Sequence, residues 1–410
     1  MNGSGVWHAE QAWLGHPAKD VLIEVQAGRI KTVTEGASIP AGATSLPGWT
    51  IPGLANVHSH AFQHTLRATV ESGAGDFWAW RQEMYRRTEW DWAGYYRYSR
   101  MVFQEMLESG ITAVGEFHYL HQRGNELGEA LIQAAVEVGL RITLIDACYL
   151  RGGLDGRPLD EAQRSFSDGD AERWAARVDQ LKDAAGVRIA AAIHSVRAVD
   201  PASMHTVAAW ARGRSTPLHI HLAEQPAEVE ECKTIEGCTP AQLLDREGIL
   251  GQDLTAIHAI HVDEHDISLL GSNRVTVCAC PTTERDLGDR VGPLRALADA
   301  GCPLAVGSDS NAVIDILEEA RALELDQRRA TGHRVIHQPE ELLCAATANG
   351  MRALGWEAGE LKAGMLADFI TLDQPRYAEP GQLEAAYLIY GGSAREVTTV
   401  VVGGRTVLAK

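Results

Sequence analysis

Short apolar runs typical of strands alternate with helix-like stretches along the middle of the chain, and this alternation restricts the possible folds more than any other feature. The strand-like runs are Trp49–His58, Ile111–His118, Arg141–Tyr149, Val187–Ser195, Pro217–Leu222, Leu254–Val262, Arg274–Cys280 and Pro303–Gly307. The helix-like stretches between them include Tyr96–Glu108, Glu126–Val138, Ala171–Ala184, Ala202–Arg212 and Gly292–Ala300. Eight strand–helix units over about 290 residues are what a (β/α)₈ TIM barrel requires. A doubly wound open sheet is the alternative, but no G-x-G-x-x-G motif follows the first strand to support it.

The two ends of the chain have a different character, with strand-like runs broken by glycine and proline and with little helix. These runs are Val21–Val25, Arg29–Thr34, Leu366–Leu372 and Val397–Leu408. Two β-rich termini that flank a barrel predict one small β-sandwich domain, built from residues 1–50 and 361–410. The catalytic barrel is then expected over residues 51–360.

Charge and cysteine content narrow the class of protein. With 37 basic and 55 acidic side chains the net charge is −18, which argues against nucleic acid or an anionic membrane as a partner. The seven cysteines form no C-x-x-C pair, which fits a reducing compartment. No signal peptide is visible, and no uncharged apolar run reaches 18 residues. We therefore expect a cytoplasmic protein that acts on small molecules.

Histidine pairs stand at the ends of two predicted strands, as His58-Ser59-His60 and His219-Ile220-His221. Residues i and i+2 of a strand point the same way, so both imidazoles of each pair can reach one point at the barrel mouth. TIM barrels place their sites at that mouth. The alternative for His58 and His60 is a pair of hydrogen-bonded loop histidines.

Other strand ends carry further polar residues, namely Glu224 after the fifth strand, His258 on the sixth and Asp309 after the eighth. Taken singly, His221 could be a buried strand histidine and Asp309 a helix N-cap. Taken together, three imidazoles and a carboxylate match the ligands of a divalent first-row metal ion, with Zn²⁺ as the default. The pattern therefore predicts a metal site at the barrel mouth.

These motifs resemble the amidohydrolase superfamily. The segment Pro52–His60 is similar to its first-strand motif, and His221-x-x-Glu224, His258 and Ser308-Asp309 fall where its aminohydrolase branch has its other site residues. The segments Thr347–Gly350 and Gly364–Asp368 look like the closing segments of that branch, so the resemblance covers nearly the whole chain. Within the superfamily the sequence is most similar to the formimidoylglutamate deiminases, through the stretches His58–Gln63, Phe77–Arg81, Glu116–Tyr119 and Cys280–Glu284.

The resemblance implies a role for each matching residue. It implies that one divalent metal ion, Zn²⁺, is bound by His58, His60, His221 and Asp309. It implies that Glu224 shuttles protons and that His258 orients and polarises the reacting group. The substrate-contacting positions that it implies are Gln63, Arg81, Tyr119, His194 and Arg197. Arg86 competes with Arg81 because the preceding loop, Ser72–Asp76, is short. A homodimer is common in this family and is expected here.

The implied reaction is the hydrolysis of N-formimino-L-glutamate to N-formyl-L-glutamate and ammonia in histidine degradation. Zinc lowers the pKa of a bound water toward 7, so that hydroxide forms at neutral pH. Asp309 can accept a proton from that water, and Glu224 is close enough along the chain to carry one to the departing nitrogen. A substrate with two carboxylates needs cations, and Arg197 could grip one bidentately. The alternative for Arg197 is a surface arginine paired with a helix carboxylate.

Several alternatives stay open at this point. No lysine lies in a predicted barrel strand to bridge a second metal ion, so the site is expected to be mononuclear unless a carboxylate such as Glu116 bridges. The chain could instead deaminate a heterocycle such as guanine, or be a non-catalytic amidohydrolase-like scaffold. The aromatic segment Phe77–Trp80 could be a lid or a subunit contact. Cys278 and Cys280 are expected in the core with no histidine or cysteine partner nearby, and His118 and His121 are expected to be supporting or solvent-exposed histidines.

Overall fold

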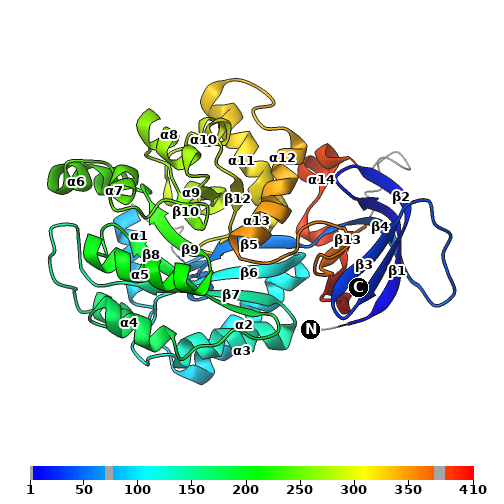
Figure 1. The fold of residues 1–410 in the computed structure, drawn as a ribbon, viewed down its shortest axis with the longest axis horizontal. Helices are drawn as coiled ribbons and strands as arrows, with labels where there is room; N and C mark the ends of the chain where they lie inside the picture. Colours follow the sequence, from blue (N-terminus) through cyan, green and yellow to red (C-terminus); the bar gives the residue numbers. More distant parts are fainter. Residues whose placement is uncertain (1–2, 70–76, 374–383) are drawn as a thin grey trace.

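The computed structural model of the chain describes residues 3–69, 77–373 and 384–410, which form a barrel and an adjoining sheet (Figure 1). The barrel, surrounded by helices, occupies the left of the view, and the sheet built from both ends of the chain lies on the right. Within the described ranges, no helix is long and apolar enough to cross a membrane.

Eight parallel strands form the barrel, and each one is hydrogen-bonded to the next in chain order. They are β5 (Leu54–Ser59), β6 (Ile111–His118), β7 (Arg141–Cys148), β8 (Val187–Ser195), β9 (Leu218–Leu222), β10 (Leu254–His258), β11 (Thr276–Ala279) and β12 (Leu304–Val306). The barrel closes where the Asp309 amide donates to the His58 carbonyl and the His60 amide donates to the Asp309 carbonyl, both at 2.9 Å. The strands are buried on both faces, as parallel strands covered by helices must be. The predicted TIM barrel is confirmed.

The first predicted strand, Trp49–His58, is wrong as a single element. Its first part belongs to β4 (Thr44–Pro52) of the end sheet, and β5 begins only at Leu54. Gly53 lies between the two strands, and only glycine fits there because a Cβ would lie 2.2 Å from the Thr112 hydroxyl oxygen. Periodicity could not show this break, since both strands are apolar and only one residue parts them.

Helices cover the outside of the barrel and connect its strands. They are η1 (Ala61–Leu66), α1 (Phe77–Tyr85), α2 (Trp92–Glu108), α3 (Glu126–Val138), η2 (Gln163–Phe166), α4 (Ala171–Val178), α5 (Pro201–Arg214), α6 (Pro226–Glu236), α7 (Pro240–Arg246), α8 (Glu264–Ser272), α9 (Pro281–Leu287), α10 (Leu294–Ala300), α11 (Ile316–Thr331), α12 (Pro339–Cys344), the π-helical turn η3 (Ala345–Asn349) and α13 (Gly350–Ala353). Their starts follow local rules. Asp200, for example, caps α5 by accepting from the Ser203 amide, and Pro201 takes the first helical position.

The two termini together build one seven-stranded mixed sheet, in the order β15-β14-β13-β4-β1-β2-β3. Besides β4 it contains β1 (Gly5–Trp13), β2 (Pro17–Gln26), β3 (Arg29–Thr34), β13 (Phe369–Leu372), β14 (Val397–Val402) and β15 (Arg405–Ala409). The sheet has its own apolar core, in which Trp7 of β1 packs edge-on against Phe369 of β13. This confirms the predicted β unit built from both ends, whereas the exact division into residues 1–50, 51–360 and 361–410 stays a prediction. One C-terminal helix, α14 (Ala385–Gly391), packs on the barrel instead, where Arg321 of α11 donates to the Ile389 carbonyl at 2.8 Å.

A buried ion pair joins the end sheet to the end of the barrel where β7 begins. Arg141, at the start of β7, donates to both carboxylate oxygens of Asp368 at 2.5 and 2.9 Å. Asp368 also accepts from the Gly403 amide at 2.7 Å, and the Arg141 guanidinium lies 5.3 Å from the Trp356 ring centre. Because strands of a TIM barrel run in one direction, this junction lies at the opposite end from the strand ends that carry the predicted site.

Candidate metal centre and adjoining cavity

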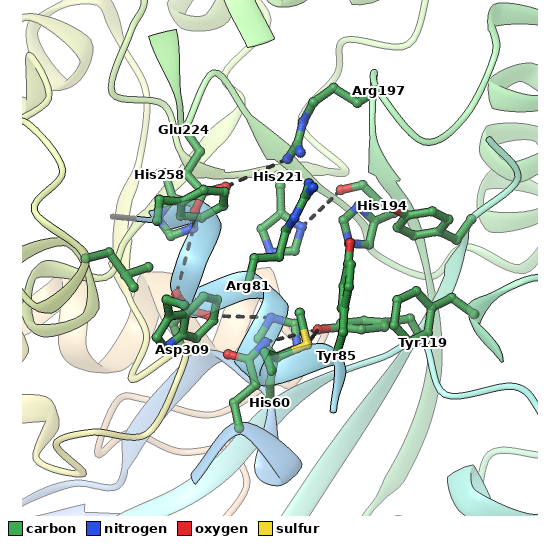
Figure 2. A pocket seen from close by; sticks show the side chains of 17 residues that line it. His60, Arg81, Tyr85, Tyr119, His194, Arg197, His221, Glu224, His258 and Asp309 are labelled. Atoms are coloured by element: carbon green, nitrogen blue, oxygen red, sulfur yellow. Dashed lines mark hydrogen bonds and ion pairs between the residues drawn. The ribbon is translucent and has the colours of Figure 1, made fainter. Parts of the chain in front are cut away.

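The structure brings the four predicted ligands together at the mouth of the barrel, where Figure 2 shows three of them, His60, His221 and Asp309. His58 and His60, at the end of β5, place their Nε2 atoms 3.2 and 3.4 Å from Asp309 Oδ1. The Nε2 atom of His221, on β9, lies 3.1 Å from the Nε2 atom of His58. The residues thus come from three barrel strands or strand ends that are far apart in the sequence.

Hydrogen bonds at the outer ring nitrogens fix the tautomers of two of these imidazoles. His60 Nδ1 lies 2.9 Å from the Phe117 carbonyl, and His221 Nδ1 lies 3.0 Å from the His194 carbonyl. A carbonyl only accepts, so each Nδ1 carries the proton and each Nε2 turns a lone pair toward the centre. This pattern is typical of metal-binding histidines.

Burial keeps the imidazoles neutral, whereas the neighbours of Asp309 keep its carboxylate charged. Desolvation lowers the pKa of His60 to about 3, and it also lowers the pKa values of His58 and His221. Burial alone would raise the pKa of the Asp309 carboxyl, but the hydrogen bond from His58 and the charge of His258 hold it below its ordinary value. Three neutral imidazoles and one carboxylate are a donor set that fits a divalent cation such as Zn²⁺.

Two acid–base side chains, Glu224 and His258, stand beside this centre. The Nε2 atom of His258 is 3.9 Å from Glu224 Oε1 and 3.9 Å from Asp309 Oδ2. Burial raises the pKa of Glu224 to about 7. For His258, desolvation opposes the charge of Glu224 and the hydrogen bond of Nδ1 to Glu284, and the net effect raises its pKa to about 10. Glu224 can therefore gain or lose a proton near neutral pH, and the Nε2 atom of His258 faces both Glu224 and Asp309 as a hydrogen-bond donor.

The backbone is strained at several of these strand ends. Ala223, His258 and Asp309 have φ values of 49°, 71° and 43°, in the left-handed region that residues with a side chain rarely adopt. Such conformations persist only where the surrounding contacts enforce them, and they cluster at functional sites. Here they turn the chain sharply as it leaves the strand, which directs Glu224, His258 and Asp309 to one place.

A cavity of about 60 Å³ opens next to the metal centre. Its walls include all five predicted substrate-contacting residues, which are Gln63, Arg81, Tyr119, His194 and Arg197. Gln63 Nε2 donates to the Tyr119 hydroxyl at 3.0 Å, so these two side chains hold each other in place. Arg81 lines the cavity, but the competing Arg86 has 76% of its side chain exposed and pairs with Glu83 at 2.8 Å. The Ser72–Asp76 loop invoked in that comparison lies outside the described residues.

Arg197 combines the two roles considered for it. Only 16% of its side chain is exposed, so a surface position is wrong, yet its Nε does donate to a helix carboxylate, Oε2 of Glu228 on α6, at 2.8 Å. Its NH2 group lies 3.9 Å from Glu224 Oε2, the contact drawn in Figure 2. A guanidinium held by Nε still has N–H groups on its terminal nitrogens that can meet a ligand.

The second histidine pair does not converge as predicted. His219 and His221 lie on the same face of β9, but His219 Nε2 lies 3.2 Å from the Ala353 carbonyl instead of at the metal centre. Two residues along a strand cover about 7 Å, so the two imidazoles occupy different layers of the barrel interior. Only at the end of β5, where the chain turns, do i and i+2 meet at one point, with ring centres 4.6 Å apart.

Sequence reasoning also misjudged or missed other residues near the site. Cys280 is buried as expected, but its thiol lies within 4.8 Å of ligand atoms of His258 and Asp309, so the expected lack of a histidine partner is wrong. Its place at the end of β11 could have shown this, since every other strand end used here points to the mouth. The cavity also has walls from residues that sequence reasoning did not single out as its lining, which are Trp80, Met84, Tyr85, Tyr149, Phe166 and Leu287. Trp80, Met84 and Tyr85 lie on α1 at the i, i+4 and i+5 positions of one helix face, which is a helical spacing that the sequence contained and that could have found them. Tyr149, Phe166 and Leu287 lie beyond the end of a strand, in η2 and in α9, where no such pattern marks them.

His118 and His121 belong to a separate buried cluster with Asp146. Arg177 of α4 already donates to both oxygens of Asp146 at 2.8 Å, and its Nε donates to Asp168 at 2.7 Å. Burial and Arg177 would lower the pKa of His121, but Asp146 and Asp168 raise it above its ordinary value. Arg177 therefore bonds both carboxylates, and the ring nitrogens of His121 lie 3.3 Å from Asp146 and 3.4 Å from Asp168, so the cluster is a closed ion network.

Comparisons with known proteins agree with this fold and show the family of the chain. A sequence model of the amidohydrolase family matches residues 49–407. The formimidoylglutamate deiminase of Pseudomonas aeruginosa is 32% identical, over 95% of this chain and 91% of its own. A 5-methylthioadenosine/S-adenosylhomocysteine deaminase of Moorella thermoacetica is also 32% identical, over 88% of this chain and 82% of its own. Among solved structures, an amidohydrolase from Brucella melitensis superposes with a TM-score of 0.90 at 30% identity, over 99% and 95% of the two chains.

Proposed function

Since the chain belongs to the amidohydrolase family, whose members hydrolyse their substrates with the help of metal ions, we propose that it is a formimidoylglutamate deiminase. It hydrolyses N-formimino-L-glutamate to N-formyl-L-glutamate and ammonia. It uses one divalent metal ion, Zn²⁺, at His58, His60, His221 and Asp309. As an enzyme of histidine degradation it would act in the cytoplasm as a homodimer.

The observation that carries the choice of substrate is the pair of arginines beside the metal centre. Arg81 and Arg197 both line the cavity, and a molecule with two carboxylates needs two such cations.

The metal ion is inferred from the chemistry of its ligands. The lone pair of His221 Nε2 faces His58 Nε2 at 3.1 Å, and Asp309 Oδ1 lies 3.2 Å from that atom, so nitrogen and oxygen atoms of the kind that bind zinc converge on one place. When bound, such an ion supplies a water of lowered pKa, which is a nucleophile at neutral pH.

The residues of the chain then divide the proton transfers among them. Asp309 accepts one proton of the attacking water and returns it to the formimino nitrogen, while Glu224, whose pKa burial raises to about 7, takes up the other water proton and delivers it to the same nitrogen, which thereby gains the two protons that ammonia needs. His258 donates from Nε2 to the negative charge that develops as the water oxygen adds to the carbon. The carbon–nitrogen bond breaks, the nitrogen leaves as ammonia, and the formyl carbonyl forms. Arg81 and Arg197 hold the carboxylates while this happens.

A deaminase that acts on a heterocycle is the second candidate. Its support is the aromatic part of the cavity wall, Trp80, Tyr149 and Phe166, against which a flat ring can stack. The relatives named as 5-methylthioadenosine/S-adenosylhomocysteine deaminases act on such rings. The two candidates share the metal centre and differ in the cavity.

Ammonia release by the purified, metal-loaded protein separates these candidates. The substrates are N-formimino-L-glutamate, guanine, 5-methylthioadenosine and S-adenosylhomocysteine. We expect kcat/KM for N-formimino-L-glutamate to exceed that for each ring substrate by at least 100-fold. The reverse order would replace the proposed substrate with a heterocycle. Release from none of the four, at full metal occupancy, would revive the non-catalytic scaffold.

A further inference from the structure

Glu228 is a buried carboxylate that touches two parts of the site without lining the cavity. It lies in the first turn of α6, and its side chain is fully shielded from solvent. Its Oε1 accepts from the Ala223 amide at 3.0 Å, and its Oε2 accepts from Arg197 Nε at 2.8 Å. Burying a carboxylate is costly unless it is paired and hydrogen-bonded, and each oxygen of Glu228 has such a partner.

The first contact acts on the turn that carries Glu224. Ala223 directly precedes Glu224 and has a φ of 49°, a conformation that costs free energy for a residue with a Cβ. The charge-assisted bond from its amide to Glu228 holds this turn, together with the bond from the His261 amide to the Ala223 carbonyl at 2.9 Å. The direction in which Glu224 leaves the turn therefore depends on Glu228.

The second contact acts on Arg197. Because Nε is engaged by Glu228, the terminal nitrogens of the guanidinium are left for the cavity and for Glu224, whose Oε2 lies 3.9 Å away. If the charge of Glu228 were removed, Glu224 would be the nearest carboxylate to a largely buried cation. Arg197 would then turn from the cavity toward Glu224.

We propose that Glu228 is a positioning residue that holds Arg197 toward the substrate carboxylate and holds the turn of Glu224 toward the reacting nitrogen. One buried carboxylate thereby couples substrate binding to proton transfer. The part that concerns the substrate carboxylate rests on the proposed function.

Glu228→Gln tests the contact with Arg197. The new amide can still accept from the Ala223 amide, but its NH₂ group faces the N–H of Arg197, and two donors cannot bond. We expect the Kd of the product N-formyl-L-glutamate, measured by calorimetry, and the KM of the substrate to rise at least tenfold, with a smaller fall in kcat. Glu230→Gln is the matched control, since Glu230 is exposed on the same helix. A Kd within twofold of this control would overturn the proposal for Arg197.

Glu228→Ala tests the contact with the turn, because the Ala223 amide then loses its acceptor. We expect kcat to fall at least tenfold further than in Glu228→Gln, while Kd stays close to the value for that variant. Equal kcat values in the two variants would overturn the part of the proposal that concerns Glu224.

A double-mutant cycle with Arg197→Met shows whether Glu228 acts through Arg197. In the Arg197→Met background, Glu228→Gln should change Kd less than twofold, because there is no guanidinium left to position. The double variant also removes both buried charges together, so it should melt at a higher temperature than Glu228→Gln alone. If Glu228→Gln does not fold, recovery of folded protein in the double variant supports the coupling, and its absence contradicts it.

These outcomes are separate from those that test the proposed function. Each variant is compared with the unsubstituted chain on whichever substrate that chain turns over best. If this is a heterocycle, the proposed function fails, while the effect of Glu228→Ala on kcat still tests the positioning of Glu224.

Discussion

The two ends of the barrel bury charged and polar side chains equally well but satisfy them differently. At the junction with the end sheet, Arg141 donates two hydrogen bonds to the Asp368 carboxylate, and the Gly403 amide donates a third. At the mouth, His221 Nε2 turns its lone pair toward His58 Nε2 at 3.1 Å, and Asp309 Oδ1 lies 3.2 Å from the same His58 atom. The junction is complete with residues of the chain alone, whereas the mouth gathers the nitrogen and oxygen atoms of the proposed metal site.

This difference separates stability from function. A closed ion pair affects the free energy of unfolding and takes no part in chemistry. Removing one partner leaves an uncompensated buried charge. The cluster at the mouth has strained turns and shifted pKa values, which are features of sites where chemistry takes place. We therefore expect substitutions at the junction to change the free energy of unfolding and those at the mouth to change turnover.

Glu224→Gln should produce the largest effect and should affect turnover alone. An amide of the same shape cannot carry a proton, and a positioned acid–base group contributes up to about 10⁴-fold to rate. We expect kcat to fall by about that factor, with metal content and melting temperature unchanged. The measurements are steady-state ammonia release and metal analysis of the same preparation. Turnover within tenfold of the unsubstituted enzyme would remove Glu224 from the mechanism.

Arg141→Met should have the opposite signature. It leaves Asp368 charged and buried with no guanidinium, and breaking a buried pair costs about 3–5 kcal/mol. We expect urea denaturation to show a loss of this size, while kcat per folded molecule stays within twofold. A large loss of kcat at full folding would break the comparison, because it would mean that the junction also controls the mouth.

The same contrast explains how much could be predicted from the sequence. The barrel and its mouth leave local signals, since a polar residue such as His60 or Glu224 at the end of an apolar run reveals both the strand and its direction. The junction leaves none, because Arg141 and Asp368 are 227 residues apart and look like ordinary charged residues. Glu228 and Phe166 were missed for the same reason, since their roles depend on how a helix or loop packs. The prediction for His219 was wrong because the spacing of two residues shows which face of the strand a side chain is on, but not how deep in the barrel it lies.

The sequence could not decide whether Arg81 or Arg86 contacts the substrate. Substituting each in turn tests how far the substrate site extends from the mouth of the barrel. A charged hydrogen bond to a ligand is worth about 1.5–3 kcal/mol, which corresponds to roughly 10- to 150-fold in affinity. We expect Arg81→Met to raise KM for N-formimino-L-glutamate by a factor in that range. Arg86→Met should change it less than twofold, because Arg86 is exposed and pairs with Glu83. Equal effects would place the boundary of the substrate site outside the cavity described here.

The smallest expected effect is a pH dependence that only the mouth can produce. Burial raises the pKa of Glu224 to about 7 in the metal-free protein, and a bound cation nearby would lower this value toward the ordinary one. Glu224 must be ionised to take up the proton that it delivers. Its raised pKa therefore makes kcat/KM fall as the pH drops, about tenfold per unit below the midpoint of this acid limb.

We expect that midpoint between the ordinary glutamate pKa and about 7. Metal content measured across the same pH range provides the control, because protonation of the histidine ligands would release the ion and imitate the limb. A flat profile down to pH 4.5 at constant metal content would show that Glu224 is no more perturbed than a surface carboxylate. The pKa values of the mouth would then give no sign of a functional site, and the distinction between the two ends of the barrel would rest on geometry alone.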